Sequence, residues 1–396
     1  MAALKGNLFY NLINQLQLIV FPIFLNIYLV RILNLEDLGK WYLVNSAAAL
    51  IQLLITAPHF FLVKHISAGK NNIGQITSSG IFTYLFLLFG ATPFYVAYII
   101  AAAPGTEVVA MMVFAHLMFS ALSCEFYFQA TLKQKFLMIR RGVSRGVLLI
   151  LLLIFVKEPS DFILFLILTI GIYILDHLVG LWVVAREVSL VRPPKKVLFS
   201  TILSIREMLP LNATHNTLPH IVLLISPVFF DFDLVAIVSI LVRITNMATT
   251  VVTSSVNVIF PFLLSKQGDS LLRLRLGYLT SIVAVGLGGA CFLLNETIAV
   301  LFLNRELSDE QVLGFGLLCL YILIHSVYNY ISFNFFVAAL RTIRVTQCNI
   351  LILFVFFVSV NLVPINIVSF LGLMSASAGM GLLALVFFTR DLQERL

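Results

Sequence analysis

Apolar residues are grouped along the chain into long stretches separated by short polar segments. A helix needs about 20 apolar residues to cross the core of a bilayer, and the sequence holds about twelve stretches of roughly that length. Each stretch is therefore predicted to be a membrane-spanning helix. The fifth is short, and the eighth is long enough to tilt or to project from the lipid. The predicted spans cover approximately residues 8–30, 41–63, 78–102, 108–132, 143–157, 161–185, 207–230, 234–264, 277–303, 311–339, 345–363 and 366–389.

Basic residues are distributed unevenly between the two alternating sets of connecting segments. Of the 25 lysines and arginines, one set contains only Arg31, Lys40, Lys157 and Arg305, and Arg243 lies within a span, which leaves twenty in the other set. Cytoplasmic loops of multispanning proteins carry such an excess. The asymmetry predicts that both termini are cytoplasmic and that the number of spans is even.

The composition excludes a soluble fold, because 61% of the residues are hydrophobic and only 11% are charged, whereas about a quarter of a globular domain is charged. The net charge of +7 is explained by the basic loops, so nucleic-acid binding is not implied. No glycine-rich phosphate loop is present, which argues against ATP hydrolysis. All four cysteines lie in spans without metal-like spacing and are interpreted as small core residues, so neither a metal nor a cofactor is expected.

The longest predicted cytoplasmic connection, residues 186–206, divides the spans six and six. The chain is therefore predicted to form an N-terminal six-helix lobe (1–185), a linker (186–206) and a C-terminal six-helix lobe (207–396). Such parallel halves suit alternating access, in which two lobes rock about a site near the midplane. The end of the connection, from Val197 to Met208, is equally consistent with a short helix on the inner leaflet and with a plain linker.

Polar side chains recur on one face of the eighth predicted span. Arg243, Asn246, Thr250, Ser254 and Asn257 follow one another at helical spacing, which predicts that this face lines a cavity or a protein interface rather than lipid. Such groups either line a wet central space or form hydrogen bonds between helices, which are common in membrane proteins. The same alternatives hold for Asn11, Gln15 and Asn26 in the first span, for Asn212, Asn216 and His220 in the seventh, and for His325 and Asn329 in the tenth.

Three ionisable residues lie at similar depth in two other spans, namely Glu125 in the fourth and Asp176 and His177 in the sixth. An ionisable residue inside a span is costly and is a functional candidate by default. One hypothesis is a proton relay, since histidine titrates near neutrality and burial raises the pKa of a carboxylate. The alternative is a buried polar pair that locks the helices together.

One segment resembles a known family. The segment from Tyr28 to Tyr42, which follows Pro22 after a few mostly apolar residues, resembles the first outside loop of bacterial polysaccharide flippases of the Wzx type. The pattern of that family is approximately Pro, a few apolar residues, then Tyr-Leu-x-Arg-x-Leu-Gly-x-Glu-x-Phe-Gly-x-Tyr. Asn34 stands at the usual glycine, where it tolerates a left-handed turn, and Leu38 at the usual phenylalanine. Residues 64–68 and 231–265 also resemble that family, and the likeness extends to the whole chain in span number and loop lengths.

The resemblance implies a V-shaped, all-helical transporter of the multidrug/oligosaccharidyl-lipid/polysaccharide superfamily in the bacterial inner membrane. It implies a flippase that moves an undecaprenyl-pyrophosphate-linked oligosaccharide, such as an O-antigen repeat unit, from the cytoplasmic to the periplasmic leaflet. The implied partners are membrane lipids and glycan-assembly proteins such as a polymerase or a chain-length regulator. Cationic groups would bind the pyrophosphate. The candidates are Arg243 first, then Arg31 and Lys40 at the outer mouth, and Arg140, Arg141 and Arg145 at the inner mouth. For the last three, the favoured alternative is topology signalling, in which they only set the orientation of the chain in the membrane.

Two other functions remain open. An ion-coupled exporter of drugs or organic cations would have the same fold and would need acidic groups, which Glu125 and Asp176 supply. A membrane glycan polymerase or glycosyltransferase would also act on lipid-linked sugars, but such enzymes carry a large outside loop with catalytic residues, and the longest outside loop here has about ten residues. The sequence therefore favours a transporter rather than an enzyme.

Overall fold

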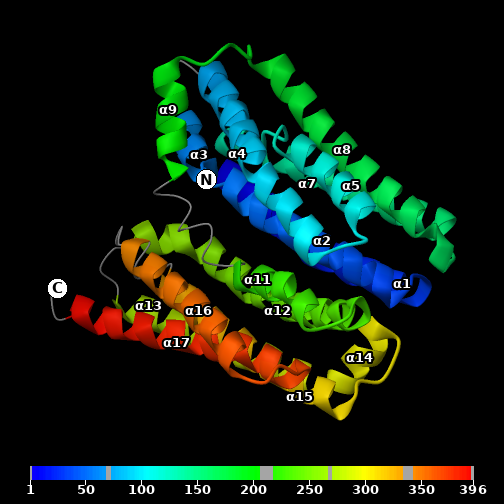
Figure 1. Ribbon diagram of the computed structural model, residues 1–396. Helices are drawn as coiled ribbons and strands as arrows, with labels where there is room; N and C mark the ends of the chain where they lie inside the picture. Colours follow the sequence, from blue (N-terminus) through cyan, green and yellow to red (C-terminus); the bar gives the residue numbers. More distant parts are fainter. Residues whose placement is uncertain (1, 68–72, 206–216, 266–269, 333–341, 394–396) are drawn as a thin grey trace. The chain divides into compact units, whose positions relative to one another are not determined.

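All regular structure in the described part of the chain is helical. The computed structural model describes residues 2–67, 73–205, 217–265, 270–332 and 342–393. The helices form two compact units, Met1–Asn212 and Ala213–Leu396 (Figure 1). The predicted boundaries of the two lobes, at residues 185 and 207, stay a prediction.

In the first unit, the long helices pack side by side in a bundle. Helix α7 lies between α1 and α8, α2 packs on α4 and α5, and α3 packs on α6. The elements of this unit are α1 (Ala2–Ile32), α2 (Leu35–Ile55), α3 (His59–Ser67), α4 (Ile73–Ala102), α5 (Glu107–Ser120), α6 (Glu125–Ala130), α7 (Gln134–Phe155), the 3₁₀ turn η1 (Pro159–Asp161), α8 (Phe162–Glu187) and α9 (Lys195–Leu203).

Helix α9 lies in the segment that was predicted as a linker. It packs against α4, where the hydroxyl oxygens of Ser79 and Thr201 are 2.9 Å apart and both side chains are buried. For residues 197–203 the helix is therefore the correct alternative and the plain linker is wrong, whereas residues 206–208 lie outside the described part. Its position at a membrane surface stays a prediction.

In the second unit, α15 is the central helix and packs on α12, α13 and α17. A capping box starts α15, because the Ser308 hydroxyl accepts from the Gln311 backbone N–H and the Gln311 side chain accepts from the Ser308 N–H. The elements of this unit are α11 (Thr217–Ile225), the 3₁₀ turn η2 (Ser226–Val228), α12 (Phe232–Ser265), α13 (Ser270–Leu293), α14 (Asn295–Leu303), α15 (Asp309–Ile331), α16 (Thr342–Leu362) and α17 (Ile367–Gln393).

Several predicted spans are broken rather than continuous. The stretch 108–132 is divided into α5 and α6 at Cys124, whose φ of 51° lies in the left-handed region. A non-glycine residue rarely adopts this conformation, and the helix cannot continue through it. The stretch 277–303 bends by 72° between α13 and α14. The break before α6 places Glu125 at the start of a new helix.

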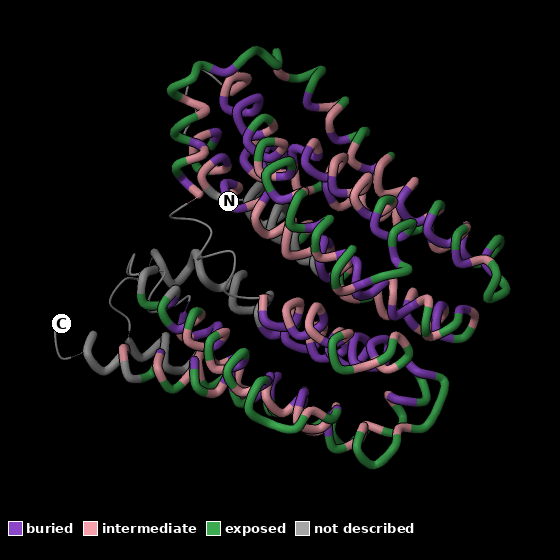
Figure 2. Tube along the Cα trace, viewed as in Figure 1, coloured by how far each residue is buried: buried purple, intermediate pink, exposed green. Residues whose placement is uncertain are grey.

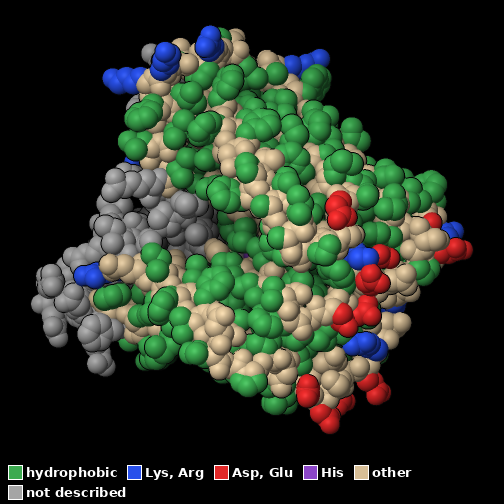
Figure 3. Space-filling model, in the orientation of Figure 1, with side chains coloured by type: hydrophobic (Ala, Val, Ile, Leu, Met, Phe, Trp, Pro, Cys, Tyr) green, Lys and Arg blue, Asp and Glu red, His purple; other side chains and the backbone are tan. Residues whose placement is uncertain are grey.

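The surface of the described residues suits a membrane. Many large apolar side chains are exposed, for example Phe86, Phe94 and Ile100 on α4. Figure 2 marks the exposed residues along the helices, and Figure 3 shows hydrophobic side chains over much of one face. Within the described ranges, seven helices are long and apolar enough to cross a bilayer, or eight if the bent pair α13 and α14 is one span. The chain is therefore an all-helical, multispanning membrane protein, whereas twelve spans and the cytoplasmic termini stay predictions.

Two details differ from the sequence-based expectations. Helix α7 begins at Gln134, well before the predicted span 143–157, so Arg140 and Arg141 lie on a packed helix rather than in a loop. Asn34 has φ −65° and ψ 144°, so the left-handed turn expected there is wrong. Asn34 instead has extended backbone at the N-cap of α2, a position that asparagine favours.

Candidate functional site

The first unit contains a cluster of charged side chains on α6, α7 and α8. Glu125 begins α6, Arg140, Arg141 and Arg145 lie on α7, and Asp176 lies on α8. Adjacent residues on a helix point about 100° apart, whereas residues four apart share a face. Arg140 and Arg141 therefore point in different directions, and Arg141 and Arg145 point the same way.

Arg140 is the buried centre of the cluster. Its side chain is only 3% exposed, and its Nε lies 3.1 Å from Asp176 Oδ1 while Nη2 lies 3.5 Å from Glu125 Oε1. The guanidinium also lies over the rings of Phe128 and Phe136, 5.8 and 5.9 Å from their centroids. A buried charge without a partner is strongly destabilising. Arg140 therefore joins α6, α7 and α8 electrostatically, which is the helix-locking alternative for Glu125 and Asp176.

A glycine on α8 makes room for this arginine. A Cβ atom added at Gly180 would lie 2.2 Å from Arg140 Nη1, closer than non-bonded atoms approach. We expect Gly180→Ala to push Arg140 off Asp176 and to lower the free energy of unfolding of the first unit by about 1–3 kcal/mol, the usual cost of overpacking. Thermal unfolding of the purified protein in detergent measures the change.

The matched control for Gly180→Ala is Gly171→Ala on the same helix, because a Cβ atom there meets nothing within 4 Å. Alanine is the better helix former, so this variant should unfold at the wild-type temperature or slightly above it. Equal stability of the two alanine variants would show that Gly180 is not needed to seat Arg140.

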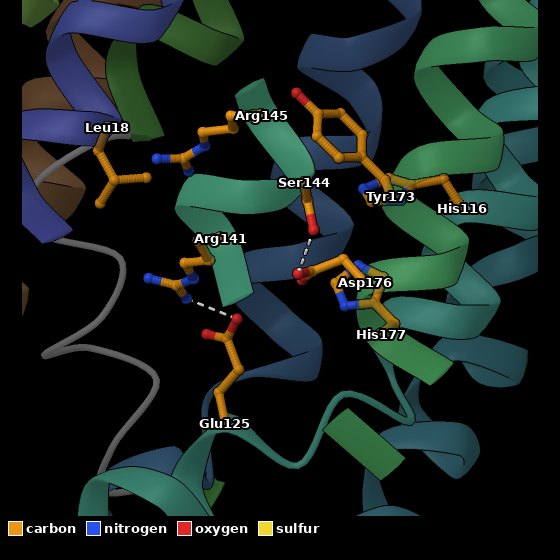
Figure 4. A pocket seen from close by; sticks show the side chains of 9 residues that line it. All are labelled: Leu18, His116, Glu125, Arg141, Ser144, Arg145, Tyr173, Asp176 and His177. Atoms are coloured by element: carbon orange, nitrogen blue, oxygen red, sulfur yellow. Dashed lines mark hydrogen bonds and ion pairs between the residues drawn. The ribbon is translucent and has the colours of Figure 1, made fainter. Parts of the chain in front are cut away.

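Arg141 and Arg145 face a cavity of about 200 Å³ in the same unit. Arg141 Nη2 lies 2.5 Å from Glu125 Oε1, and its Nη1 donates a hydrogen bond of 3.1 Å to Asn14 Oδ1 on α1. Figure 4 shows both guanidinium groups extending to the same side of α7, with Glu125 reaching toward Arg141. The lining residues are Leu18, His116, Glu125, Arg141, Ser144, Arg145, Tyr173, Asp176 and His177.

Arg145 is held differently from its two neighbours. Its guanidinium lies 5.8 Å from the ring centroid of Phe21. Its Nη1 is buried, and no described residue accepts a hydrogen bond from it. A buried donor without an acceptor is costly, so this nitrogen is suited to bind an oxygen of a ligand.

The other side of the cavity is polar and aromatic. Ser144 donates a hydrogen bond of 2.8 Å to Asp176 Oδ1, which holds the carboxylate in place beside Arg140. The rings of His116 and His177 are stacked with centroids 5.3 Å apart, and the ring of Tyr173 also lies 5.3 Å from that of His116. Both ring nitrogens of His177 are buried and have no hydrogen-bond partner among the described residues.

The cluster joins residues that the sequence had assigned to two different tasks. Arg140, Arg141 and Arg145 were candidates for the pyrophosphate, with topology signalling as the favoured alternative. Glu125, Asp176 and His177 were candidates for a proton relay, with helix locking as the alternative. Four further residues that the sequence had not singled out for this site, Asn14, His116, Ser144 and Tyr173, belong to it as well. The i, i+4 spacing of Arg140 and Ser144 was a usable signal for Ser144, but no pattern linked α1 or α5 to these residues.

Most other predicted site residues of the first unit lie outside the cavity. Arg31 is exposed at the end of α1, and Lys40 forms an ion pair of 2.6 Å with Glu36. Asn26 is buried and accepts a hydrogen bond of 2.9 Å from the Tyr42 hydroxyl, so it connects α1 and α2. The side chains of Asn11 and Gln15 are outside the described part.

In the second unit, Arg243 lies on α12 and His220 on α11. Asn246 accepts a hydrogen bond of 2.7 Å from Thr250 through its backbone carbonyl. His325 is buried with its Nδ1 3.1 Å from the Tyr321 hydroxyl, and Asn329 is buried one turn later. Asn212, Asn216 and the side chain of Asn257 lie outside the described residues. The assignment of Arg243 to the substrate stays a prediction.

No family model and no curated protein matches the sequence. Solved structures match its fold, however. A lipid II flippase, MurJ, in an inward closed conformation has a TM-score of 0.70 and 10% identity over 96% of this chain and 87% of its own. A multidrug resistance MATE family transporter of the MOP superfamily, in an inward-facing conformation, has a TM-score of 0.65 and 12% identity over 98% of this chain and 96% of its own.

The chain has the fold of MOP-superfamily transporters. A MATE protein in a bent conformation matches as well, with a TM-score of 0.53 and 11% identity over 98% of this chain and 92% of its own. At such identities the likeness concerns the fold and leaves the substrate undetermined. In the described residues, no group of three or more His, Cys, Asp or Glu side chains is arranged to hold a metal ion.

Proposed function

We propose that the chain is a flippase that moves an undecaprenyl-pyrophosphate-linked oligosaccharide from the cytoplasmic to the periplasmic leaflet of a bacterial inner membrane. The head group of such a lipid does not cross hydrocarbon unaided, because its phosphates and hydroxyls would lose their hydration. A protein that moves it must offer polar and cationic groups within the membrane. Likeness to the fold of a lipid II flippase supports a lipid-linked substrate.

One observation carries this proposal, namely the surplus of arginine in and behind the cavity of the first unit. Three arginines meet only two carboxylates there, Glu125 and Asp176, in the part of the chain that the structure describes. Arginine's planar set of donors fits phosphate oxygens, and Nη1 of Arg145 has no acceptor among the described residues. The cavity is therefore suited to an anion with several oxygens.

A second candidate, an ion-coupled exporter of organic cations, has some support. Glu125 and Asp176 line the cavity, and one structure of the same fold is described as a multidrug resistance transporter. Both carboxylates are already held by arginine, however, at 2.5 Å for Glu125 and 3.1 Å for Asp176. An organic cation would have to displace an arginine from its carboxylate, which makes the anion the better substrate.

Leaflet transfer tests the proposal directly. The purified protein is reconstituted into liposomes with a short undecaprenyl-pyrophosphate-linked oligosaccharide that carries a fluorescent sugar label, under an imposed pH gradient, an imposed sodium gradient or no gradient. A reductant that does not cross the membrane then bleaches only the outer leaflet. We expect bleaching beyond the outer-leaflet fraction of protein-free liposomes, with the glycan unchanged in length.

Two other results would contradict the flippase. Uptake of an organic cation such as tetraphenylphosphonium, without movement of the labelled lipid under any gradient, would identify the exporter. A lengthened glycan would identify a polymerase.

A further inference from the structure

The three arginines of α7 are held in three different ways. Arg140 does not line the cavity, has a side chain that is 3% exposed and contacts both carboxylates. Arg141 lines the cavity and is paired with Glu125. Arg145 also lines the cavity, and its buried Nη1 donates a hydrogen bond to none of the described residues. Only Arg141 is therefore both accessible to a ligand and already engaged by a carboxylate.

We infer that Glu125 is a resident competitor for the anion site, which a pyrophosphate must displace from Arg141 and a single phosphate need not. This inference rests on the proposed function. Without a ligand, the Glu125 carboxylate forms an ion pair with Arg141, and an anion that binds Arg141 must displace this carboxylate. A ligand that reaches only Arg145 gains one guanidinium, whereas a ligand with two linked phosphates reaches Arg145 and also replaces Glu125 at Arg141.

The geometry of α7 places the two cavity arginines as one binding unit. Arg141 and Arg145 are one helical turn apart, and side chains at this spacing are neighbours, with Cβ atoms about 5–6 Å apart. Both guanidinium groups extend to the same side of the helix (Figure 4). A diphosphate can contact both groups, whereas a monophosphate bound at Arg145 leaves the ion pair of Glu125 and Arg141 in place.

Glu125 is able to release Arg141 without losing all of its counter-charge. Arg140 Nη2 remains 3.5 Å from the same carboxylate oxygen of Glu125, and Arg140 itself stays fixed because Asp176 pairs with its Nε. The side chains of Glu125 and Arg141 are 26% and 17% exposed, so both have room to turn. Asn14, the other partner of Arg141, is a neutral amide that orients the guanidinium without neutralising it.

The back wall of the site has no comparable freedom. Asp176 is fixed between Arg140 and Ser144, and Arg140 packs directly against Gly180 of α8. The exchange is therefore confined to one pair, Glu125 and Arg141. This confinement allows a substitution of Glu125 to change anion selectivity while the buried Arg140–Asp176 contact is kept.

The test measures binding of inorganic pyrophosphate and of inorganic phosphate to the full-length protein in detergent by isothermal titration calorimetry. The variants are Glu125→Gln, Arg141→Gln and the double variant Glu125→Gln/Arg141→Gln. Glu187→Gln is the matched control, because Glu187 pairs with Lys133 away from the cavity. Glutamine keeps the shape of glutamate but not its charge, so the pairing with Arg141 weakens.

We expect Glu125→Gln to bind pyrophosphate about tenfold more tightly, because one charge-assisted contact that competes with this ligand is lost. Phosphate should gain little, because it need not displace Glu125, so the preference for pyrophosphate over phosphate widens. In the Arg141→Gln background the same substitution should have no effect, because the contested group is gone. Glu187→Gln should bind both anions as the wild type does.

A second variant keeps the test decisive if Glu125→Gln does not fold. Glu125→Asp retains the charge but withdraws it by one methylene from Arg141, and we expect a smaller gain in pyrophosphate affinity. Pyrophosphate binding that is unchanged or weaker in the folded Glu125 variants would overturn the competitor role alone, and so would a gain that persists without Arg141. If neither the wild type nor the variants bind pyrophosphate, the proposed function fails and the inference fails with it.

Discussion

Replacing Arg140 by alanine is expected to destabilise the first unit by about 3–5 kcal/mol, because a buried ion pair that loses one partner leaves the other charge without compensation. Asp176 loses its contact of 3.1 Å, and Glu125 loses its contact of 3.5 Å. The apparent melting temperature of the purified protein in detergent should fall on the order of 10 °C. Light scattering during heating or a thiol-reactive dye measures it.

A double variant separates charge from packing in this prediction. Arg140→Met with Asp176→Leu replaces both charges by apolar side chains, a change that is often neutral for a buried pair, while Glu125 keeps Arg141 at 2.5 Å. Most of the lost stability should return. If Arg140→Ala alone melts at the wild-type temperature, the buried ion pairs of Arg140 do not hold α6, α7 and α8 together.

The second large effect is expected on transport. Arg145→Ala removes the cavity guanidinium whose Nη1 has no acceptor among the described residues, so a bound phosphate loses a charge-assisted hydrogen bond. We expect pyrophosphate affinity to fall roughly 10- to 100-fold and leaflet transfer of the labelled lipid to become undetectable. The melting temperature should change little, because no described acceptor depends on that nitrogen.

Two further variants give this prediction its controls. Arg145→Lys keeps the charge but loses the planar donor fork, so part of the binding should return. Arg186→Ala removes an exposed arginine that stacks on Trp182, 3.8 Å from its ring centroid and outside the cavity, and it should transport as the wild type does. Wild-type transport by Arg145→Ala would remove Arg145 from the substrate site.

Much of the helical organisation could be predicted from apolar stretches, because each is long enough to be a helix whatever it packs against. The breaks were not predictable in the same way. The stretch 108–132 is apolar throughout, yet it is interrupted at Cys124, whose left-handed backbone is stabilised by tertiary packing rather than by local preference. Glu125 owes its position at the start of α6 to this break.

The candidate site shows the same division. Arg140 and Arg141 are neighbours with identical side chains, and the sequence assigned them one role together with Arg145. The fold separates them, because the turn of the helix directs Arg140 to Asp176 and leaves Arg141 at the cavity. Glu125 and Asp176 were proposed as a relay, and the arginine that contacts both of them came from a segment predicted as a loop.

The sequence by itself therefore determined that this is a helical membrane protein and which ionisable residues lie among its apolar segments, since length and hydrophobicity are properties of each segment alone. Which arginine is buried, which carboxylate it meets and which guanidinium groups line a cavity were decided only by the tertiary structure. These properties depend on the distances between α1, α6, α7 and α8, and apolar patterning does not encode which helices become neighbours or how they are rotated.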